Sequence, residues 1–281
     1  MGDKQIKVTY KKSYTSKILT ALTWGASGLA MAVLAFLILF ILIKGLGNIT
    51  PDLFSFHYTS ENASLMPAVV NTLFMTFISL AIAAPLGIFA AIFLVEYTDN
   101  KGKVVGLIRL TAETLSGIPS IVYGLFGMLF FATTLKWGYS MLSGAFTMAI
   151  MILPLVMRTS EEALVSVPVS YREASFGLGA GKLRTVFRIV LPAAVPGILS
   201  GVILATGRVV GETAALIFTA GTVAKYAGLM DSGRTLAVHM YVLSSEGLHM
   251  DKAYATAVVL LVFVLAINGI SGLVAKKIAK G

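Results

Sequence analysis

Two charged residues lie inside a long apolar stretch of the chain, and their spacing suggests a possible chemistry. Arg208 and Glu212 are four residues apart, so on a continuous helix they share one face and can form an intrahelical ion pair. Each charge would cost roughly 2.5 to 3.5 kcal/mol at a bilayer centre, so neither is expected to face lipid. Two interpretations stay open. Arg208 offers a hydrogen-bonding station to a passing anion while Glu212 partly neutralises it, or the pair is a structural or gating salt bridge.

The other residues that could do chemistry give weaker signals. Glu113 lies several residues into another apolar stretch, where it either faces a pathway or is solvated at the membrane boundary. The three histidines share no ligand spacing, cysteine is absent and no G-x-S-x-G motif occurs, so neither a metal centre nor nucleophilic catalysis is predicted. Gly181-Lys182 lacks the flanking residues of a phosphate-binding loop. We therefore expect no ATP hydrolysis by this chain.

Composition indicates that these residues belong to a membrane protein. The chain is 57% hydrophobic and only 12% charged, whereas about 25% of the residues in soluble domains are charged. This composition excludes disorder, a collagen-like structure and nucleic-acid binding. Six stretches are long enough to cross a hydrocarbon core, which takes roughly 20 helical residues. We predict an all-α integral membrane protein with six transmembrane helices, at about 18–43, 67–95, 107–135, 137–157, 189–218 and 253–275.

The distribution of lysine and arginine predicts the orientation in the membrane. Sixteen of the 22 basic residues lie in the two tails, the second-to-third connection and the fourth-to-fifth connection. Because cytoplasmic loops retain positive charge, both termini are predicted to be cytoplasmic. The net charge of +9 follows from this asymmetry and does not indicate a nucleic-acid partner.

Proline and glycine interrupt several of the predicted spans. Such breaks are tolerated where neighbouring helices or a water-lined cavity satisfy the freed backbone groups, which favours a moving bundle around a path. Gly197-x-x-x-Gly201 and Gly207-x-x-x-Gly211 have a spacing of small residues that lets helices approach closely. The prolines inside spans are Pro85, Pro119, Pro154 and Pro196.

The connection between the fourth and fifth spans carries the most specific pattern. Ser170 and Glu173 are spaced as a capping box that would start a short helix. Gly177, Gly179 and Gly181 are available to end it before the next helix begins. We predict a short cytoplasmic helix here, and a rigid element of this kind suits docking onto a partner.

This connection resembles the EAA loop of ABC importer permeases. That family shows E-A-A, three residues, G, nine residues and I-x-L-P, and this chain has Glu173-Ala174-Ser175, then Gly179, then Ile189-Val190-Leu191-Pro192. Ser175 is the one departure, a small residue for a small one that would leave the helix surface nearly as open. In the family the loop forms a coupling helix in a groove of the cytoplasmic ATPase. The resemblance implies that role for about 161–188, with Ser170, Arg172, Glu173, Ala174, Ser175, Gly179, Leu191 and Pro192 as coupling residues.

Two further segments are similar to the A-type permease subunits of phosphate-specific (Pst) transporters. They are ETLSGIPSIVYGLFG at 113–127 and GRVVGETAAL at 207–216. The family usually has proline where this chain has Ala215, so a less sharp helix break is expected there. The resemblance implies the type-1 importer permease (MetI-like) fold. Residues 1–66 would hold a tail, the first span and an extracytoplasmic loop, and 67–276 the permease core, with Arg208, Glu212 and Glu113 on the substrate pathway.

The resemblance also implies a function and partners. The chain would be a non-enzymatic subunit that moves inorganic phosphate into a prokaryotic cell across the inner or plasma membrane by alternating access. It would bind no cofactor, and it would work with a C-type permease, two ATPases that carry ATP and Mg²⁺, and an extracytoplasmic phosphate-binding protein. Three alternatives stay open: import of another oxyanion such as molybdate or sulfate, ion-coupled secondary transport with Glu113 or Glu212 as proton carrier, and a membrane sensor without flux.

Overall fold

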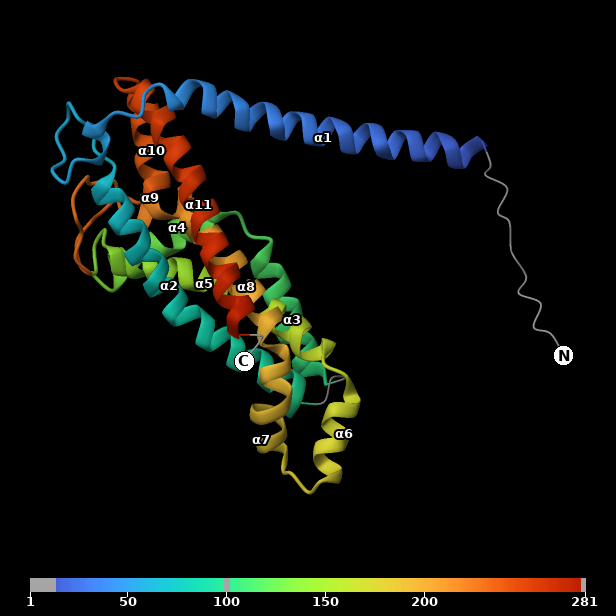
Figure 1. The fold of residues 1–281 in the computed structure, drawn as a ribbon. Coiled ribbons are helices and arrows are strands. Elements are labelled where there is room, and N and C mark those ends of the chain that lie inside the picture. Colours follow the sequence, from blue (N-terminus) through green and yellow to red (C-terminus); the bar gives the residue numbers. More distant parts are fainter. Residues whose placement is uncertain (1–13, 99–101, 279–281) are drawn as a thin grey trace. The chain divides into compact units, whose positions relative to one another are not determined.

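The computed structural model describes residues 14–98 and 102–278, and this part of the chain is helical, without a β-strand (Figure 1). Five of its helical segments are long and apolar enough to cross a membrane: Tyr14–Leu46, Met66–Tyr97, Met141–Ser166, Lys182–Gly211 and Met250–Ala275. The expected all-α membrane fold is therefore confirmed. Basic residues that contribute to the predicted orientation at Lys4, Lys7, Lys11, Lys12, Lys101 and Lys280 lie outside the described residues, and the orientation stays a prediction.

The third predicted span differs from the single helix expected over 107–135. α3 (Lys103–Ser116) is followed by α4 (Ser120–Gly127) and the π-helical turn η3 (Met128–Thr134), and the two parts are bent by 98°. Pro119 lies at the bend and has no N–H to continue the helical ladder. The Tyr123 hydroxyl donates to the Leu115 carbonyl across the bend at 2.8 Å. A sixth span exists only if this bent pair is counted as one.

Helix α1 (Tyr14–Leu46) belongs almost entirely to a separate unit that ends at Lys44. Large apolar side chains are exposed along its whole length, including Trp24 and Phe36. A helix with apolar residues on every face is suited to lipid, where its backbone groups are satisfied internally.

In the second unit, Gly45–Gly281, the long helices pack on one another (Figure 1). α2 (Met66–Ile92, continued by the π-helical turn η2, Phe93–Tyr97) packs on α5 (Met141–Ser166), and both α5 and α11 (Met250–Ile278) pack on α8 (Leu191–Gly211). A Cβ at Gly197 would lie 2.7 Å from the Ala163 Cβ, and a Cβ at Gly201 would collide with Thr159. The first small-residue spacing is therefore a close contact between α8 and α5.

The fourth and fifth predicted spans are shifted in the structure. α5 runs to Ser166, nine residues beyond the expected end, and the fifth helical run starts with α7 (Lys182–Thr185) and the π-helical turn η4 (Val186–Val190). That run stops at Gly211 instead of 218, and α9 (Ala214–Thr219) follows as a separate short helix. The remaining helices are η1 (Pro51–Phe54), α6 (Val169–Gly177) and α10 (Leu236–Glu246).

The second unit has two distinct ends (Figure 1). α6 and α7 lie at one end, and α10 lies at the other, beside the segment that precedes α2. Buried Asn71 of α2 holds the loop before α10: its Nδ2 donates to the Lys225 and Arg234 carbonyls at 2.9 and 3.1 Å, and its Oδ1 accepts from the Ala227 N–H at 3.0 Å. Asn71 thus fixes the loop to α2, and the neighbouring Thr72 hydroxyl accepts the Leu236 N–H at the start of α10.

Candidate functional site

Arg208 and Glu212 do not form the predicted intrahelical ion pair. The helix ends at Gly211, and Glu212 has an extended backbone with φ −72° and ψ 131°. Its Oε1 instead accepts the Ala215 N–H at 3.1 Å, which caps the start of α9. The prediction assumed a continuous helix, and the break turns the carboxylate away from the i, i+4 position. Among the described residues Arg208 has no ion pair or hydrogen bond.

The two segments that carry the phosphate-permease resemblance pack directly on each other. A Cβ at Gly124 of α4 would lie 2.8 Å from the Ala215 Cα of α9, so only glycine allows this approach. The break falls at Glu212 and Thr213, and Ala215 supplies the capped N–H that a proline would lack. The expectation of a less sharp break than in the family stays a prediction. The charge of Arg208 lies close enough to act on the Tyr123 phenol.

Arg208 lines a cavity that sequence analysis did not anticipate. The cavity, about 660 Å³ in volume, lies between α5, α8 and α11, and its polar lining includes Ser200 and Asn268. The Asn268 Oδ1 is buried and has no hydrogen-bond partner among the described residues. Asn268 is a single amide in an otherwise apolar stretch of α11, and such a polar residue in a span is a usable signal for function. An unpaired guanidinium and an unpaired amide thus share one cavity inside the membrane-spanning part.

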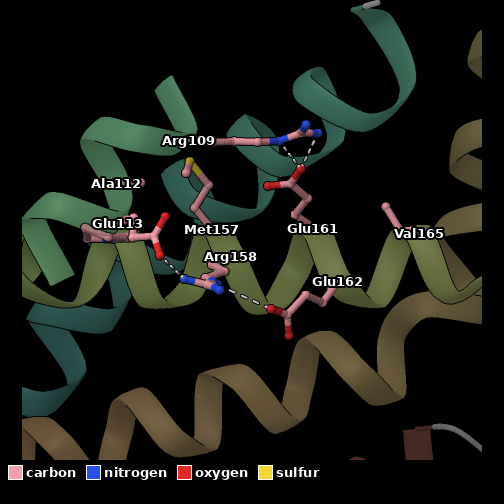
Figure 2. A pocket seen from close by; sticks show the side chains of 9 residues that line it. Arg109, Ala112, Glu113, Met157, Arg158, Glu161, Glu162 and Val165 are labelled. Atoms are coloured by element: carbon pink, nitrogen blue, oxygen red, sulfur yellow. Dashed lines mark hydrogen bonds and ion pairs between the residues drawn. The ribbon is translucent and has the colours of Figure 1, made fainter. Parts of the chain in front are cut away.

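Glu113 lies in a different cavity, between α3 and α5 (Figure 2). Its side chain is 70% exposed, and its Oε1 is 3.8 Å from an Nη1 of Arg158, which also pairs with Glu162. Beside them the Arg109 Nε donates to the Glu161 Oε1 at 2.6 Å. Of the three predicted pathway residues, the structure therefore places Glu113 in a charged cluster apart from the Arg208 cavity.

The predicted coupling helix exists as α6, but it starts differently from the prediction. Pro168 is the N-cap, and no side chain caps the first turn, so Ser170 and Glu173 do not form a capping box. The helix ends at Gly177 as expected, and Gly179 takes φ +81°, a left-handed conformation that favours glycine. The tight turn lets the Ala180 N–H bond the Ser175 carbonyl at 3.1 Å.

The small size of Ser175 suggests a nearly open helix surface at this position. The structure shows that Ser175 does not contribute to one. It is buried, and its hydroxyl is 2.8 Å from the Thr185 hydroxyl of α7. The contact fastens α6 to α7. Ser170, Glu173 and Ala174 remain exposed. Leu191 and Pro192 lie at the start of α8, where Leu191 packs at the edge of a buried apolar cluster and Pro192 is exposed.

Arg172 of α6 points into the protein instead of away from it. Its Nε and Nη2 donate to the Glu96 Oε1 at 3.1 and 2.6 Å, and the two side chains are 17% and 8% exposed. Its Nη1 and Nη2 also donate to the Val167 and Leu164 carbonyls at the end of α5, at 2.9 and 3.0 Å. One guanidinium therefore connects α6 to the ends of α2 and α5.

A second contact joins the same elements. The Lys182 ammonium lies over the Tyr97 ring, 5.1 Å from its centroid. Glu96 and Tyr97 both belong to η2, the π-helical turn that ends α2. The loop made of α6 and α7 thus holds η2 from both of its helices, which sequence spacing could not reveal because the partners are more than 70 residues apart.

The outer surface of this loop is open and presents apolar residues beside basic ones. Leu178 at the tip is 90% exposed. A groove of about 560 Å³ runs between α6 and the start of the next helical run, lined by Tyr171, Ala174, Ser175, Leu178, Gly179, Ala180, Arg184, Arg188 and Ile189. Exposed apolar patches of this kind mark interaction sites.

Comparison with known proteins gives concordant results. The family model for binding-protein-dependent transport system inner membrane components matches residues 83–280. A probable ABC transporter permease of Bacillus subtilis, YqgI, is 33% identical over 281 aligned residues, covering 92% of this chain and 94% of its own. The phosphate transport system permease protein PstA 2 of Mycobacterium bovis is 33% identical over 216 residues, covering 74% of this chain and 70% of its own.

Solved structures agree on the fold. A permease chain of a bacterial alginate ABC transporter superposes with a TM-score of 0.71 at 16% identity, covering 96% of this chain and 98% of its own. A chain of the inward-facing MetNI methionine ABC transporter superposes with a TM-score of 0.62 at 17% identity, covering 76% and 94%. The predicted type-1 importer permease fold is confirmed.

Proposed function

This chain belongs to the family of binding-protein-dependent transport system inner membrane components, and from that premise we propose that it carries inorganic phosphate through an ATP-driven importer. Membership makes it a multi-pass inner-membrane permease subunit that is not itself an enzyme. Members of the family work with a separate ATPase, which hydrolyses ATP, and with a binding protein. The transported anion, and a distinct C-type permease as second subunit, are our proposal.

The observation that carries the choice of an anion is the unpaired Arg208. A guanidinium between membrane-spanning helices needs a compensating group, but the Glu212 carboxylate accepts the Ala215 N–H at the start of α9 instead. A passing phosphate would find two parallel N–H donors on Arg208 and, in the same cavity, the Nδ2 donor of Asn268, whose Oδ1 acceptor is left without a partner among the described residues. The relatives named as phosphate permeases support phosphate as the anion.

The coupling loop supplies the route by which the ATPase would act on this cavity. The apolar residues on its outer surface and the groove beside α6 suit docking onto the ATPase, which would bind ATP and Mg²⁺. Its inner surface is tied through Arg172 to α2 and α5. Movement of α6 would therefore be passed to the helices that support Arg208, and alternating access would follow from two arrangements of one packed bundle.

Two alternatives are less well supported. An ion-coupled transporter would need a protonatable carboxylate in the path, but Glu113 is largely exposed beside Arg158 and Glu212 caps α9. A sensor without flux gives no reason for the Arg208 cavity. Molybdate or sulfate would satisfy the same donors, so the choice among oxyanions depends on the relatives alone.

Radiolabelled phosphate uptake into proteoliposomes tests the proposal. The liposomes would contain this chain with its co-purifying permease and ATPase, the binding protein outside, and ATP inside or absent. We expect uptake that needs enclosed ATP, is competed by phosphate and not by sulfate or molybdate, and falls in Arg208→Gln and Asn268→Leu. The matched control is Ser200→Ala, which removes a hydroxyl already bonded to the Pro196 carbonyl at 3.0 Å. Uptake driven by an ion gradient without ATP, or competed fully by sulfate, would contradict it.

A further inference from the structure

Arg234 is a second arginine without a counter-ion, at the end of the molecule opposite the coupling loop. The residue is only 4% exposed, and it lies directly before α10. Its Nε and Nη2 are buried and make no hydrogen bond among the described residues. No carboxylate of the described chain lies within ion-pair distance of it. The Tyr58 ring, 4.9 Å from the Arg234 Cζ, offers only a cation–π contact.

The unpaired atoms around Arg234 form a cluster. Seven buried side-chain polar atoms lack a partner in the described part of the chain, and five of them belong to Arg234, Thr235 and His239. They are the two guanidinium nitrogens, the Thr235 hydroxyl and both ring nitrogens of His239. The Ala63 backbone acts on the His239 ring, so the Arg234 and Thr235 atoms are the decisive ones. Since buried polar groups in native proteins are nearly always bonded, three unpaired atoms in two adjacent residues indicate a partner that is not part of this chain.

The charge of the cluster is positive. Arginine stays protonated in proteins. Burial, and then the neighbouring Arg234 charge, lower the pKa of His239 to about 3 against an opposing effect of the Ala63 backbone, so the imidazole is neutral near pH 7. The cluster sits at the N-terminus of the 11-residue helix α10, whose dipole adds positive potential. Its partner must therefore be an anion.

The donor geometry selects the kind of anion. Nε–H and Nη2–H lie on the same edge of a guanidinium and point in parallel, which matches two oxygens of a carboxylate or phosphate. The Thr235 hydroxyl is the next residue and adds a third donor. At 4% exposure Arg234 is out of reach of a side chain from another protein, but a small ion does not need such access.

The cluster is also held rigidly. The Arg234 N–H donates to the Val223 carbonyl at 3.0 Å, and the Arg234 carbonyl accepts from Asn71. The Leu236 N–H at the start of α10 donates to the Thr72 hydroxyl at 2.8 Å. Residues whose backbone is already fixed lose less conformational entropy when they bind a ligand. This property distinguishes the cluster from an isolated charge on the surface.

We propose that Arg234 and Thr235 form a binding site for an inorganic oxyanion at the end of the permease opposite the coupling loop. Tyr58 also lines an open pocket of about 390 Å³ with His57 and Lys225. Because the Arg234 guanidinium lies against the same ring, we assign this pocket as the route of the anion to the site. The site relies on the proposed function only for its probe, inorganic phosphate. It would hold the anion on the side predicted to be extracytoplasmic, before the Arg208 cavity.

Thermal unfolding of the permease–ATPase complex in lipid nanodiscs tests the site, with phosphate, sulfate or chloride titrated at constant ionic strength and no binding protein. Ligand that binds the folded state raises the unfolding midpoint with a concentration dependence that gives its Kd. We expect phosphate to stabilise the native complex and Arg208→Gln alike. Arg234→Met should weaken this phosphate binding at least about 100-fold, and Thr235→Val about fivefold. Lys252→Met is the matched control, since it removes a cation that bonds the Glu61 carbonyl and lies outside both the Arg234 cluster and the Tyr58 pocket.

The outcomes separate this inference from the proposed function. Phosphate stabilisation that persists in Arg234→Met but is lost in Arg208→Gln would overturn the Arg234 site and leave phosphate import intact. Equal stabilisation by chloride and phosphate would overturn the oxyanion assignment. If Arg234→Met does not fold, Arg234→Lys decides, because it keeps the charge and loses the parallel donors. It should bind phosphate at least about tenfold more weakly, and native affinity in both Arg234→Lys and Thr235→Val would overturn the proposal.

Discussion

Arg172 and Arg208 are both drawn into the body of the protein, but their surroundings are opposite. Arg172 makes four hydrogen bonds, to Glu96 and to the Leu164 and Val167 carbonyls. Arg208 makes none among the described residues and faces a cavity. Four of the five N–H donors of Arg172 are bonded within the protein, so this side chain joins the elements that it touches and has little left to offer a ligand. Arg208, whose donors are unbonded among the described residues, keeps them available for a ligand and connects no elements.

The difference fits the two requirements that the proposed function sets. The α6–α7 end would have to transmit movement, and its guanidinium is committed to three helices. The proposed pathway would have to release what it binds, and the Arg208 guanidinium has no permanent acid among the described residues. Glu212 fits the same comparison. Its carboxylate lies near the proposed path but bonds the Ala215 N–H at the start of α9, so it does not neutralise Arg208. The comparison predicts stability effects at Arg172 and transport effects at Arg208.

The largest expected effect is that of Arg172→Ala. It leaves Glu96 buried without a partner, and breaking such a pair typically costs about 3–5 kcal/mol. We expect a lower unfolding temperature for the complex and loss of ATPase co-purification. Arg158→Ala is the control, because Arg158 is also an ion-paired arginine of this end but sits in exposed pairs with Glu113 and Glu162 (Figure 2). Exposed pairs contribute about 0.2–1 kcal/mol.

A partial rescue sharpens this prediction. Glu96→Gln in the Arg172→Ala background removes the buried unpaired charge, so the double variant should recover part of the lost stability. Equal unfolding temperatures for Arg172→Ala and Arg158→Ala would instead show that the contact is not maintained in the membrane, and the assignment of Arg172 as a joint would be abandoned.

The next largest expected effect is the loss of stability at acid pH that the titration of His239 causes. Arg234, the third arginine in this comparison, contributes to it. Its folded pKa of about 3 is below the ordinary value of 6.5, so the unfolded chain binds more protons between these values. Stability contributed by the neutral ring is therefore complete above pH 6.5 and is lost as the pH falls toward 3. At pH 5 the loss is about 2 kcal/mol. α10 is not among the helices long enough to span the membrane.

Unfolding of the complex in nanodiscs at pH 7.5 and pH 5 measures this loss. His239→Gln should unfold with a smaller difference between the two pH values than the native protein. Arg234→Met should also reduce the difference, because the Arg234 charge is the second cause of the lowered pKa of His239. The same acid sensitivity in the native protein and in His239→Gln would show that other groups dominate the titration.

Arg208→Gln has a smaller effect on free energy but a clear one on function. Glutamine keeps a hydrogen-bonding group and removes the charge, so we expect phosphate uptake to fall about tenfold or more, which corresponds to about 1.4 kcal/mol. The unfolding temperature and ATPase binding should stay unchanged, since the side chain has no partner to lose. A destabilised complex with normal uptake per folded molecule would return Arg208 to the structural interpretation.

The sequence went furthest where the pattern was local. The run from Ser170 to Gly181 predicted the loop helix and its glycine end correctly. The capping box failed because Pro168, with its fixed φ and missing N–H, starts the helix two residues before Ser170. The Arg208–Glu212 pair failed for a related reason, since i, i+4 spacing means proximity only on an unbroken helix.

Contacts between distant segments could not be predicted in the same way. Glu96 and Arg172 meet across 76 residues, and nothing in either neighbourhood indicates the other. The bend before Ser120 was visible as Gly117 and Pro119, but proline in a membrane helix is compatible with a kink or a complete turn, and packing decides between them. Asn268 was available as a polar residue in an apolar span, yet its importance depends on Arg208 lying beside the same cavity.

The smallest expected effect concerns Gly179, in the turn that follows α6, the helix that carries Arg172. Its φ of +81° is strained for alanine, while nothing lies within 4 Å of an added Cβ, so Gly179→Ala should cost about 1 kcal/mol through backbone strain alone. Gly177→Ala is the control: it has equally open space but lies within α6 without the positive φ, so it should be neutral or slightly stabilising. The unfolding temperature and the affinity for the ATPase measure both. Because Arg172 holds α6 independently of the turn, Gly179→Ala should weaken ATPase binding without detaching α6. An effect as large as that of Arg172→Ala would mean that the turn, and not the arginine, positions the coupling helix.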